Sequence, residues 1–126
     1  MPSINNSGQQ YQADDFLTLT LTGTVSAYRF VGLDGAHATS AGGVHDSAGI
    51  THTAGVAGDD VAVITCYSGL IECAEAIAQF GFVKPHADGS GRAINGTATD
   101  HCGRLLGAAT AAGQLVECMT LRHRHT

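Results

Sequence analysis

The segment DFLTLTLT at residues 15–22 decides the fold class, because its side chains alternate in character from one residue to the next. Leu17, Leu19 and Leu21 share one face of an extended strand, whereas Phe16 and the threonines share the other face. A strand with one apolar and one polar face is typical of an antiparallel sheet that covers a core on one side only. We therefore expect an antiparallel strand here.

Further short strand patterns follow, separated by turn residues. Residues 27–33 form a second candidate strand, which the hairpin-type turn Asp34-Gly35 is expected to end. Residues 61–67, VAVITCY, are apolar on both faces and rich in β-branched side chains. They predict a central, well-buried strand, with residues 70–73 running back as its partner.

The second half of the chain continues the pattern. Residues 80–84 predict a short strand that stops at Pro85, and residues 103–109 and 114–122 predict a hairpin-like pair. Residues 75–79 are long enough for one turn or a short helix only. These patterns together predict an all-β fold, a small antiparallel β-sandwich or barrel-like domain of short strands.

A repeated pattern relates two segments of the chain. THTAGVAGDDVAVI at 51–64 aligns with LGAATAAGQLVECM at 106–119 when Gly58 is placed on Gly113. In each copy a strand of small residues enters an Ala-Gly turn and a more apolar strand leaves it. Two copies indicate a duplicated hairpin, since a solenoid needs about three repeats or more. Chance is the alternative, because the shared residues are mostly Ala and Gly.

The composition bounds the domain organisation. The chain has 126 residues, the size of one ordinary domain, with 17 glycines, no Trp and only 13% charged residues. A core of small apolar side chains is thin, and low surface charge is typical of a protein that covers its surface with other chains. We expect a single β domain at 15–126 and an extended polar arm at 1–14, for which a frayed terminus is the alternative.

Charge and hydropathy exclude several classes of partner. The net charge is −5 with neutral His, and the six cations form no basic stripe that could neutralise phosphates, so we expect no nucleic-acid partner. No run approaches 18 apolar residues, so we expect no membrane span. The first residues, MPSINNSGQQYQADD, lack the features of a signal peptide, and we expect synthesis in a host cytoplasm.

No motif for catalysis is present. The sequence contains no nucleophile elbow of the G-x-S-x-G type, no phosphate-binding glycine loop followed by a helix, and no acid pair outside ordinary turn positions. It also lacks a C-x₂₋₄-C pair, which structural zinc sites normally contain. We therefore expect a protein that is not an enzyme and that has no cofactor and no metal.

The cysteines and the C-terminal segment each allow two interpretations. Cys66, Cys73, Cys102 and Cys118 are expected to be small buried hydrophobic residues rather than disulfides, because cytoplasm is reducing. The segment LRHRHT at 121–126 is interpreted as a solvated tail. If it is extended, its two histidines share a face and could gather around a metal or an anion on the axis of an oligomer.

The second half resembles a known family. GVAGDDVAVITCYSGLIECAEAIAQFGFVKPHADGSGRAI at 55–94 and GRLLGAATAAGQLVECMTL at 103–121 resemble the capsid cement, or decoration, proteins of tailed bacteriophages, a group long filed as a domain of unknown function. The resemblance spans about residues 50–122. This chain departs from the pattern at Phe80-Gly81-Phe82, where members often have Gly-Asp, and at Cys118, where Val is common. The elements that carry the resemblance are Gly58-Asp59, Val61 to Val63, Gly69, Ala74 to Val83, Asp88-Gly89 and Gly107 to Cys118.

The resemblance implies a head-stabilising structural protein of the virion. Such a protein is β-rich and commonly a homotrimer, sits on the outer surface of an assembled head, and bridges major capsid protein subunits. A phage fibre, tail or surface-adhesion module that binds carbohydrate is the alternative. The candidates for capsid contact are Ile4, Asn5, Tyr11 and Phe16. The candidates for the oligomer interface are Tyr67, Phe80, Phe82, His123 and His125.

Overall fold

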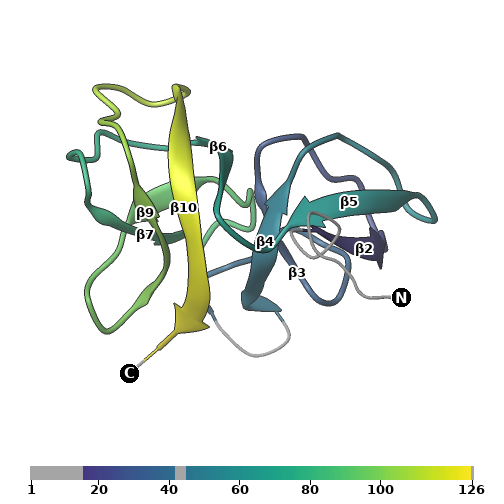
Figure 1. Ribbon diagram of the computed structural model, residues 1–126. Coiled ribbons are helices and arrows are strands. Elements are labelled where there is room, and N and C mark those ends of the chain that lie inside the picture. Colours follow the sequence, from purple (N-terminus) through teal and green to yellow (C-terminus); the bar gives the residue numbers. More distant parts are fainter. Residues whose placement is uncertain (1–15, 42–44, 126) are drawn as a thin grey trace, which may run out of the picture.

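The computed structural model describes residues 16–41 and 45–125, and in these ranges the chain forms two antiparallel sheets and no helix (Figure 1). The strand order is β2-β5-β4-β3 in the first sheet and β6-β10-β9-β7-β8 in the second. The prediction of a small all-β sandwich or barrel-like fold is confirmed. The strands are β2 Phe16–Thr20, β3 Phe30–Gly32, β4 Ser47–Thr51, β5 Asp60–Ile64, β6 Ser68–Glu72, β7 Phe82–Pro85, β8 Ala93–Asn95, β9 His101–Leu105 and β10 Leu115–Arg124.

The two sheets repeat one arrangement. In the first half β2 pairs with β5, β5 with β4, and β4 with β3. In the second half β6 pairs with β10, β10 with β9, and β9 with β7. Each half adds an isolated bridge between its loops, Val25 with Gly55 and Ile77 with Ala109. The predicted duplicated hairpin is therefore present, and it belongs to a larger repeat in which β8 is an addition to the second copy.

The repeat extends to unusual backbone conformations. Tyr28 and Phe80 have φ of 61° and 64°, although non-glycine residues rarely adopt positive φ. Each donates its N–H to the carbonyl of the last residue of a strand, β4 in the first half and β9 in the second. The turns before β5 and β10 contain Gly58 and Gly113, with φ of 92° and 89°. Both pairs of positions have positive φ in both halves, and Tyr28 and Phe80 make equivalent hydrogen bonds. The two halves therefore share one backbone conformation at these positions.

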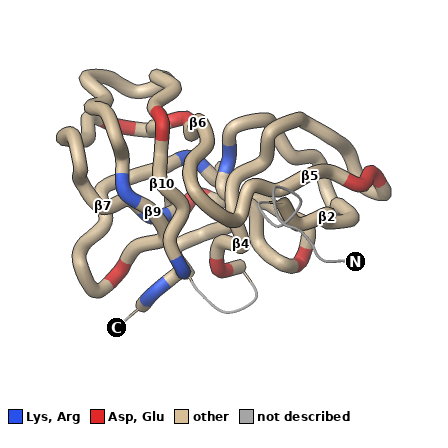
Figure 2. Tube along the Cα trace, viewed as in Figure 1, with Lys and Arg blue, Asp and Glu red and all other residues tan. Residues whose placement is uncertain are grey.

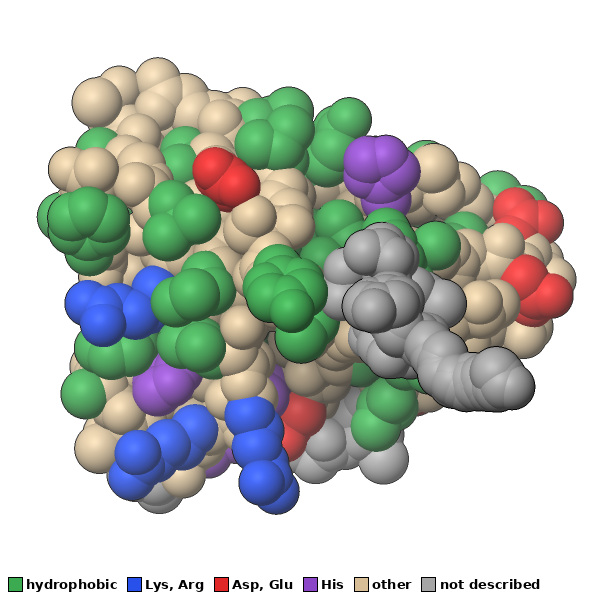
Figure 3. Space-filling view, viewed as in Figure 1, with side chains coloured by type: hydrophobic (Ala, Val, Ile, Leu, Met, Phe, Trp, Pro, Cys, Tyr) green, Lys and Arg blue, Asp and Glu red, His purple; other side chains and the backbone are tan. Residues whose placement is uncertain are grey.

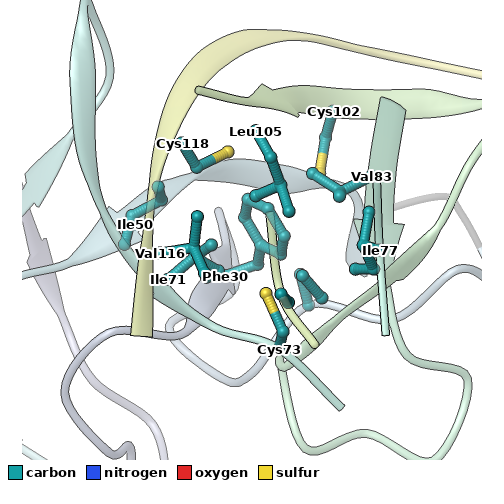
Figure 4. Packing of buried hydrophobic residues seen from close by; sticks show 13 residues of the cluster. Phe30, Ile50, Ile71, Cys73, Ile77, Val83, Cys102, Leu105, Val116 and Cys118 are labelled. Atoms are coloured by element: carbon teal, nitrogen blue, oxygen red, sulfur yellow. The ribbon is translucent and has the colours of Figure 1, made fainter. Parts of the chain in front are cut away.

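Each half has its own cluster of buried apolar side chains, and a few residues of the first half also pack inside the cluster of the second half. The smaller cluster contains Leu21, Val25, Val31, Val61 and Val63, with Leu19 packed against it. The larger cluster belongs to the second half, but Phe30 and Ile50 of the first half lie inside it, fully buried. Figure 4 shows the Phe30 ring in the middle of this cluster. The second half therefore folds around an aromatic ring that the first half supplies.

Two local expectations are wrong. The segment at 70–73 does not run back along the strand at 61–67, because β6 pairs with β10 and enters the other sheet. Tyr67, with φ of 63°, turns the chain between β5 and β6. Residues 75–79 form no helical turn, and Ile77 makes the bridge to Ala109 instead. The arm predicted at 1–14 lies outside the described residues.

The C-terminal segment and one cysteine also differ from expectation. The predicted solvated tail at 121–126 is wrong for its described residues, 121–125, because β10 continues to Arg124 and His123 has only 3% of its side chain exposed. Cys73, Cys102 and Cys118 are buried as expected, whereas Cys66 is exposed. Within the described ranges, no helix is long and apolar enough to cross a membrane.

Candidate interaction surface

The outer face of the second sheet carries an open apolar surface. Cross-strand pairing places Ser68, Met119, Arg104 and Phe82 in one row over β6, β10, β9 and β7. Phe80, 56% exposed, lies at the β7 end of the row, and Met119 is 37% exposed. In Figure 3, hydrophobic side chains gather over this part of the molecule. We call the row together with Phe80, Leu106 and Leu70 the outer face.

Arg104 organises this face. Its guanidinium lies over the Phe82 ring at 4.5 Å from the ring centre, and its Nε donates a hydrogen bond of 2.9 Å to the Phe80 carbonyl. The cation over the ring and the anchored carbonyl hold both aromatic residues in place. A shallow pocket of about 230 Å³ opens between Phe80, Arg104, Leu106 and Met119. The surface is thus apolar and locally ordered, with one positive charge at its centre.

A second pocket lies beside the outer face, where the two halves meet. It has a volume of about 310 Å³, and its lining includes Tyr28, His52, Leu70 and Glu117. Ser68 donates a 2.6 Å hydrogen bond to the Glu117 carboxylate at its edge. Glu117 lies on β10 and Arg104 on β9, so the two pockets have opposite charges near them. Figure 2 shows acidic and basic positions on these two strands.

The repeat allows this face to be compared with the equivalent sheet face of the first half. Strand for strand, the matching row there is Phe16, Ile64, Ile50 and Phe30. Ile50 and Phe30 are fully buried and Ile64 is 9% exposed, because the second half of the chain covers them. The equivalent face therefore docks against protein once already. In the second half nothing among the described residues covers it.

The buried thiols offer no nucleophile. Burial raises the pKa of Cys73 to about 11 and that of Cys118 to about 12, and it raises the pKa of Cys102 well above the usual range. A reactive cysteine needs a lowered pKa and exposure, because the thiolate is the nucleophile. These three side chains instead fill the larger core.

The candidate residues from the sequence fall in different places. Ile4, Asn5 and Tyr11 lie outside the described residues. Phe16 is 49% exposed on β2, and Tyr67 is 72% exposed in the turn before β6.

Phe80 and Phe82 lie together on the outer face, through their contacts with Arg104. His123 and His125 are also neighbours, with ring centres 4.4 Å apart, but they lie at the far end of β10. Sequence reasoning missed Arg104 and Met119. The alternation of apolar residues at 115–121 carried a signal for Met119, whereas Arg104 joins the face only through pairing of β9 with β7 and β10.

The fold is a duplicated antiparallel β domain, and no described residue covers the outer face of its second sheet. No known protein family matches the sequence, and no curated protein matches it. Among solved structures, the fold is similar to the N base of head fibre gp8.5 of bacteriophage phi29. The TM-score is 0.62 at 15% identity, and the match covers 88% of this chain and 97% of that chain. The two proteins therefore share a fold over nearly their whole lengths.

Proposed function

We propose that this chain is a structural protein of a bacteriophage head, carried on the outer surface of the virion. The observation that carries the proposal is the likeness of fold to the base of a phage head fibre, over 88% of this chain and 97% of that one. The resemblance of residues 50–122 to capsid cement proteins supports the same location. The likeness of fold carries this proposal, and the sequence resemblance points to the same class of protein.

Two roles at that surface fit the proposal. As a cement protein, the chain would bind between major capsid protein subunits and stabilise the shell, because a ligand that binds only the assembled state favours it. As the base of a fibre, it would hold a second structure on the head. The likeness to a fibre base favours the second role and the sequence resemblance favours the first.

The outer face is the part of the chain that we propose contacts another copy of itself. Its apolar side chains are exposed, and the equivalent row of the first half is already buried against protein. Phe80 and Phe82, both candidates for the oligomer interface, lie on it. A homotrimer would cover this face and leave Phe16 and the segment before it for contact with the capsid protein.

Light scattering after size exclusion tests the oligomer. We expect a mass of about three times 12.9 kDa for the parent chain. The variant Phe80→Asn with Met119→Gln removes two exposed apolar side chains, and Asn tolerates the positive φ at position 80. It should weaken association about tenfold or more, which corresponds to about 1.4 kcal/mol. A monomer at every concentration of the parent chain would contradict the trimer.

Leu33→Gln provides a matched control. Leu33 is 69% exposed in the turn after β3, so the substitution also removes an exposed apolar side chain but lies away from the outer face. We expect it to leave the oligomer unchanged. If Leu33→Gln weakened association as much as the Phe80 and Met119 variant, general surface hydrophobicity would explain the oligomer and not this face.

Co-sedimentation with assembled heads tests the location. The purified chain is mixed with heads formed by the major capsid protein of the same genome, and the pellet is assayed for the chain. We expect saturable binding. Absence of binding, together with a shift of the melting temperature by free sugars, would favour the carbohydrate-binding module instead.

A further inference from the structure

Three side chains with metal-binding atoms meet where the end of β10 reaches the start of β4. The Nε2 atom of His125 lies 2.6 Å from Oδ1 of Asp46, and Nδ1 of His123 lies 3.7 Å from the same oxygen. The ligand atoms of Asp46, His123 and His125 all lie within 4.8 Å of one another. Figure 1 shows the two strand ends side by side at the C-terminal end of β10.

The strand geometry explains why two imidazoles share this place. Side chains two positions apart on a strand point to the same side, so a His-x-His sequence on β10 presents both rings together. Asp46 precedes β4, which packs against β10, although it is 79 positions from His125 in the chain. A search for closely spaced ligands in the sequence could not find this group.

A second layer of groups orients His125. Its Nε2 faces Asp46, and its Nδ1 lies 3.1 Å from Oδ1 of Asp100. Lys84 in turn donates a 2.9 Å hydrogen bond to the other oxygen of Asp100. Metal-binding histidines usually have this arrangement, with one nitrogen toward the ion and the other donating to a carboxylate. The supporting groups are therefore in place.

His123 is held in the form that a metal requires. The backbone N–H of Ser47 donates to its Nδ1, so this nitrogen carries a lone pair and no proton. Its other nitrogen, Nε2, is buried and has no partner among the described residues. An ion would take over the Nδ1 lone pair from the Ser47 amide.

The spacing fits a small ion after a modest shift. Zinc bonds to nitrogen and oxygen are about 2.0–2.1 Å long, so tetrahedral ligands lie about 3.3 Å apart. The 3.7 Å separation in the cluster is close to that value, and the 2.6 Å contact would have to widen. The side chain of His125 is 31% exposed and can move outward.

We propose that Asp46, His123 and His125 bind one divalent transition-metal ion of the zinc class at the junction of β4 and β10. Two imidazoles and one carboxylate suit such ions, whereas calcium and magnesium prefer oxygen ligands alone. Three protein ligands leave a fourth position for water or for a group from another chain. The ion would tie the end of β10 to the start of β4.

Titration of the chelator-treated full chain with Zn²⁺ tests the proposal by calorimetry. We expect one ion per chain. His125→Gln and Asp46→Asn should each lower the affinity at least tenfold, and Asp100→Asn should lower it about 10- to 100-fold because it acts through His125. His125 is partly exposed, so its variant is expected to fold, which circular dichroism verifies.

His86→Gln is the matched control. His86 also lies beside a carboxylate, with Nδ1 at 3.2 Å from Asp88, but among the described residues it belongs to no group of three metal-binding side chains. We expect this variant to bind Zn²⁺ as the parent chain does. The proposal is overturned if the parent chain binds no Zn²⁺, or if His125→Gln binds it as tightly as the parent does.

Discussion

Replacing Phe30 with alanine would test how the two halves depend on each other. Phe30 lies on β3 of the first half, is fully buried, and packs among residues of the second half such as Leu105 and Val83. Its removal deletes a large apolar side chain and leaves a cavity that neighbouring strands can close only in part. We expect Phe30→Ala to destabilise the whole domain and not only the first sheet.

The expected magnitude follows from burial. A buried Phe→Ala substitution costs about 3–5 kcal/mol, a large part of the total of about 5–15 kcal/mol for a typical domain. With a urea dependence of about 2 kcal/mol per molar, the midpoint of urea unfolding should fall by about 2 M. Circular dichroism follows the transition, and an unchanged slope confirms that the variant unfolds from the same native state.

Phe82→Ala is the internal control, because Phe82 occupies the same place in the second half. Phe82 is only partly buried and contacts the Arg104 guanidinium and the His101 ring. We expect a loss of about 1 kcal/mol, with the chain dilute enough to prevent association. Similar losses for Phe30→Ala and Phe82→Ala would refute the claim that one of the equivalent faces is covered and the other open.

Two further predictions concern the turn before β6 and the loop before β7. Tyr67→Val should lower the free energy of unfolding by about 1–2 kcal/mol, because a β-branched residue is strained at φ of 63°. Tyr67→Asn should be tolerated, because Asn adopts positive φ more readily. Equal stability of the two variants would contradict this reasoning. Hydrogen bonds from the Asn95 backbone and side chain hold the pKa of Glu75 below its ordinary 4.5. This stabilisation is fully present above that value and is lost as pH falls through the lowered pKa. Glu75→Gln should therefore be less stable than the parent at about pH 7 in urea unfolding, and the difference should narrow as the pH falls below the ordinary pKa of Glu. A difference that does not change with pH would exclude this role of the carboxylate.

Local signals predicted most of the strands. The alternation at 15–22, the turn at Asp34-Gly35 and the hairpin around Gly113 correspond to elements of the structure, because each depends on residues near one another in the chain. The leucine face predicted to be buried on the first strand is buried only toward its C-terminal end. Leu21 is buried, but Leu17 is 37% exposed.

Local sequence patterns did not predict which distant strands pair with each other. The segment at 70–73 follows the strand at 61–67 after a short turn, which predicts a hairpin, yet β6 pairs with β10 in the other sheet. The repeat explains the outcome, since β6 takes the place in the second half that β2 takes in the first. A weak sequence repeat was thus better evidence for topology than adjacency in the chain.

The strands, the turns and the duplicated hairpin could be inferred from the residues alone, because backbone propensity and side-chain alternation act over a few positions. Two features depended on the folded chain. Phe30 and Phe82 occupy equivalent places, but only Phe30 is covered, since the second half packs against this face of the first half and no described residue packs against the outer face of the second. Asp46 and His125 meet although they are 79 positions apart. Whether a sheet face is buried, and which side chains form a site, depends on contacts between residues far apart in the sequence. Local sequence patterns do not determine those contacts.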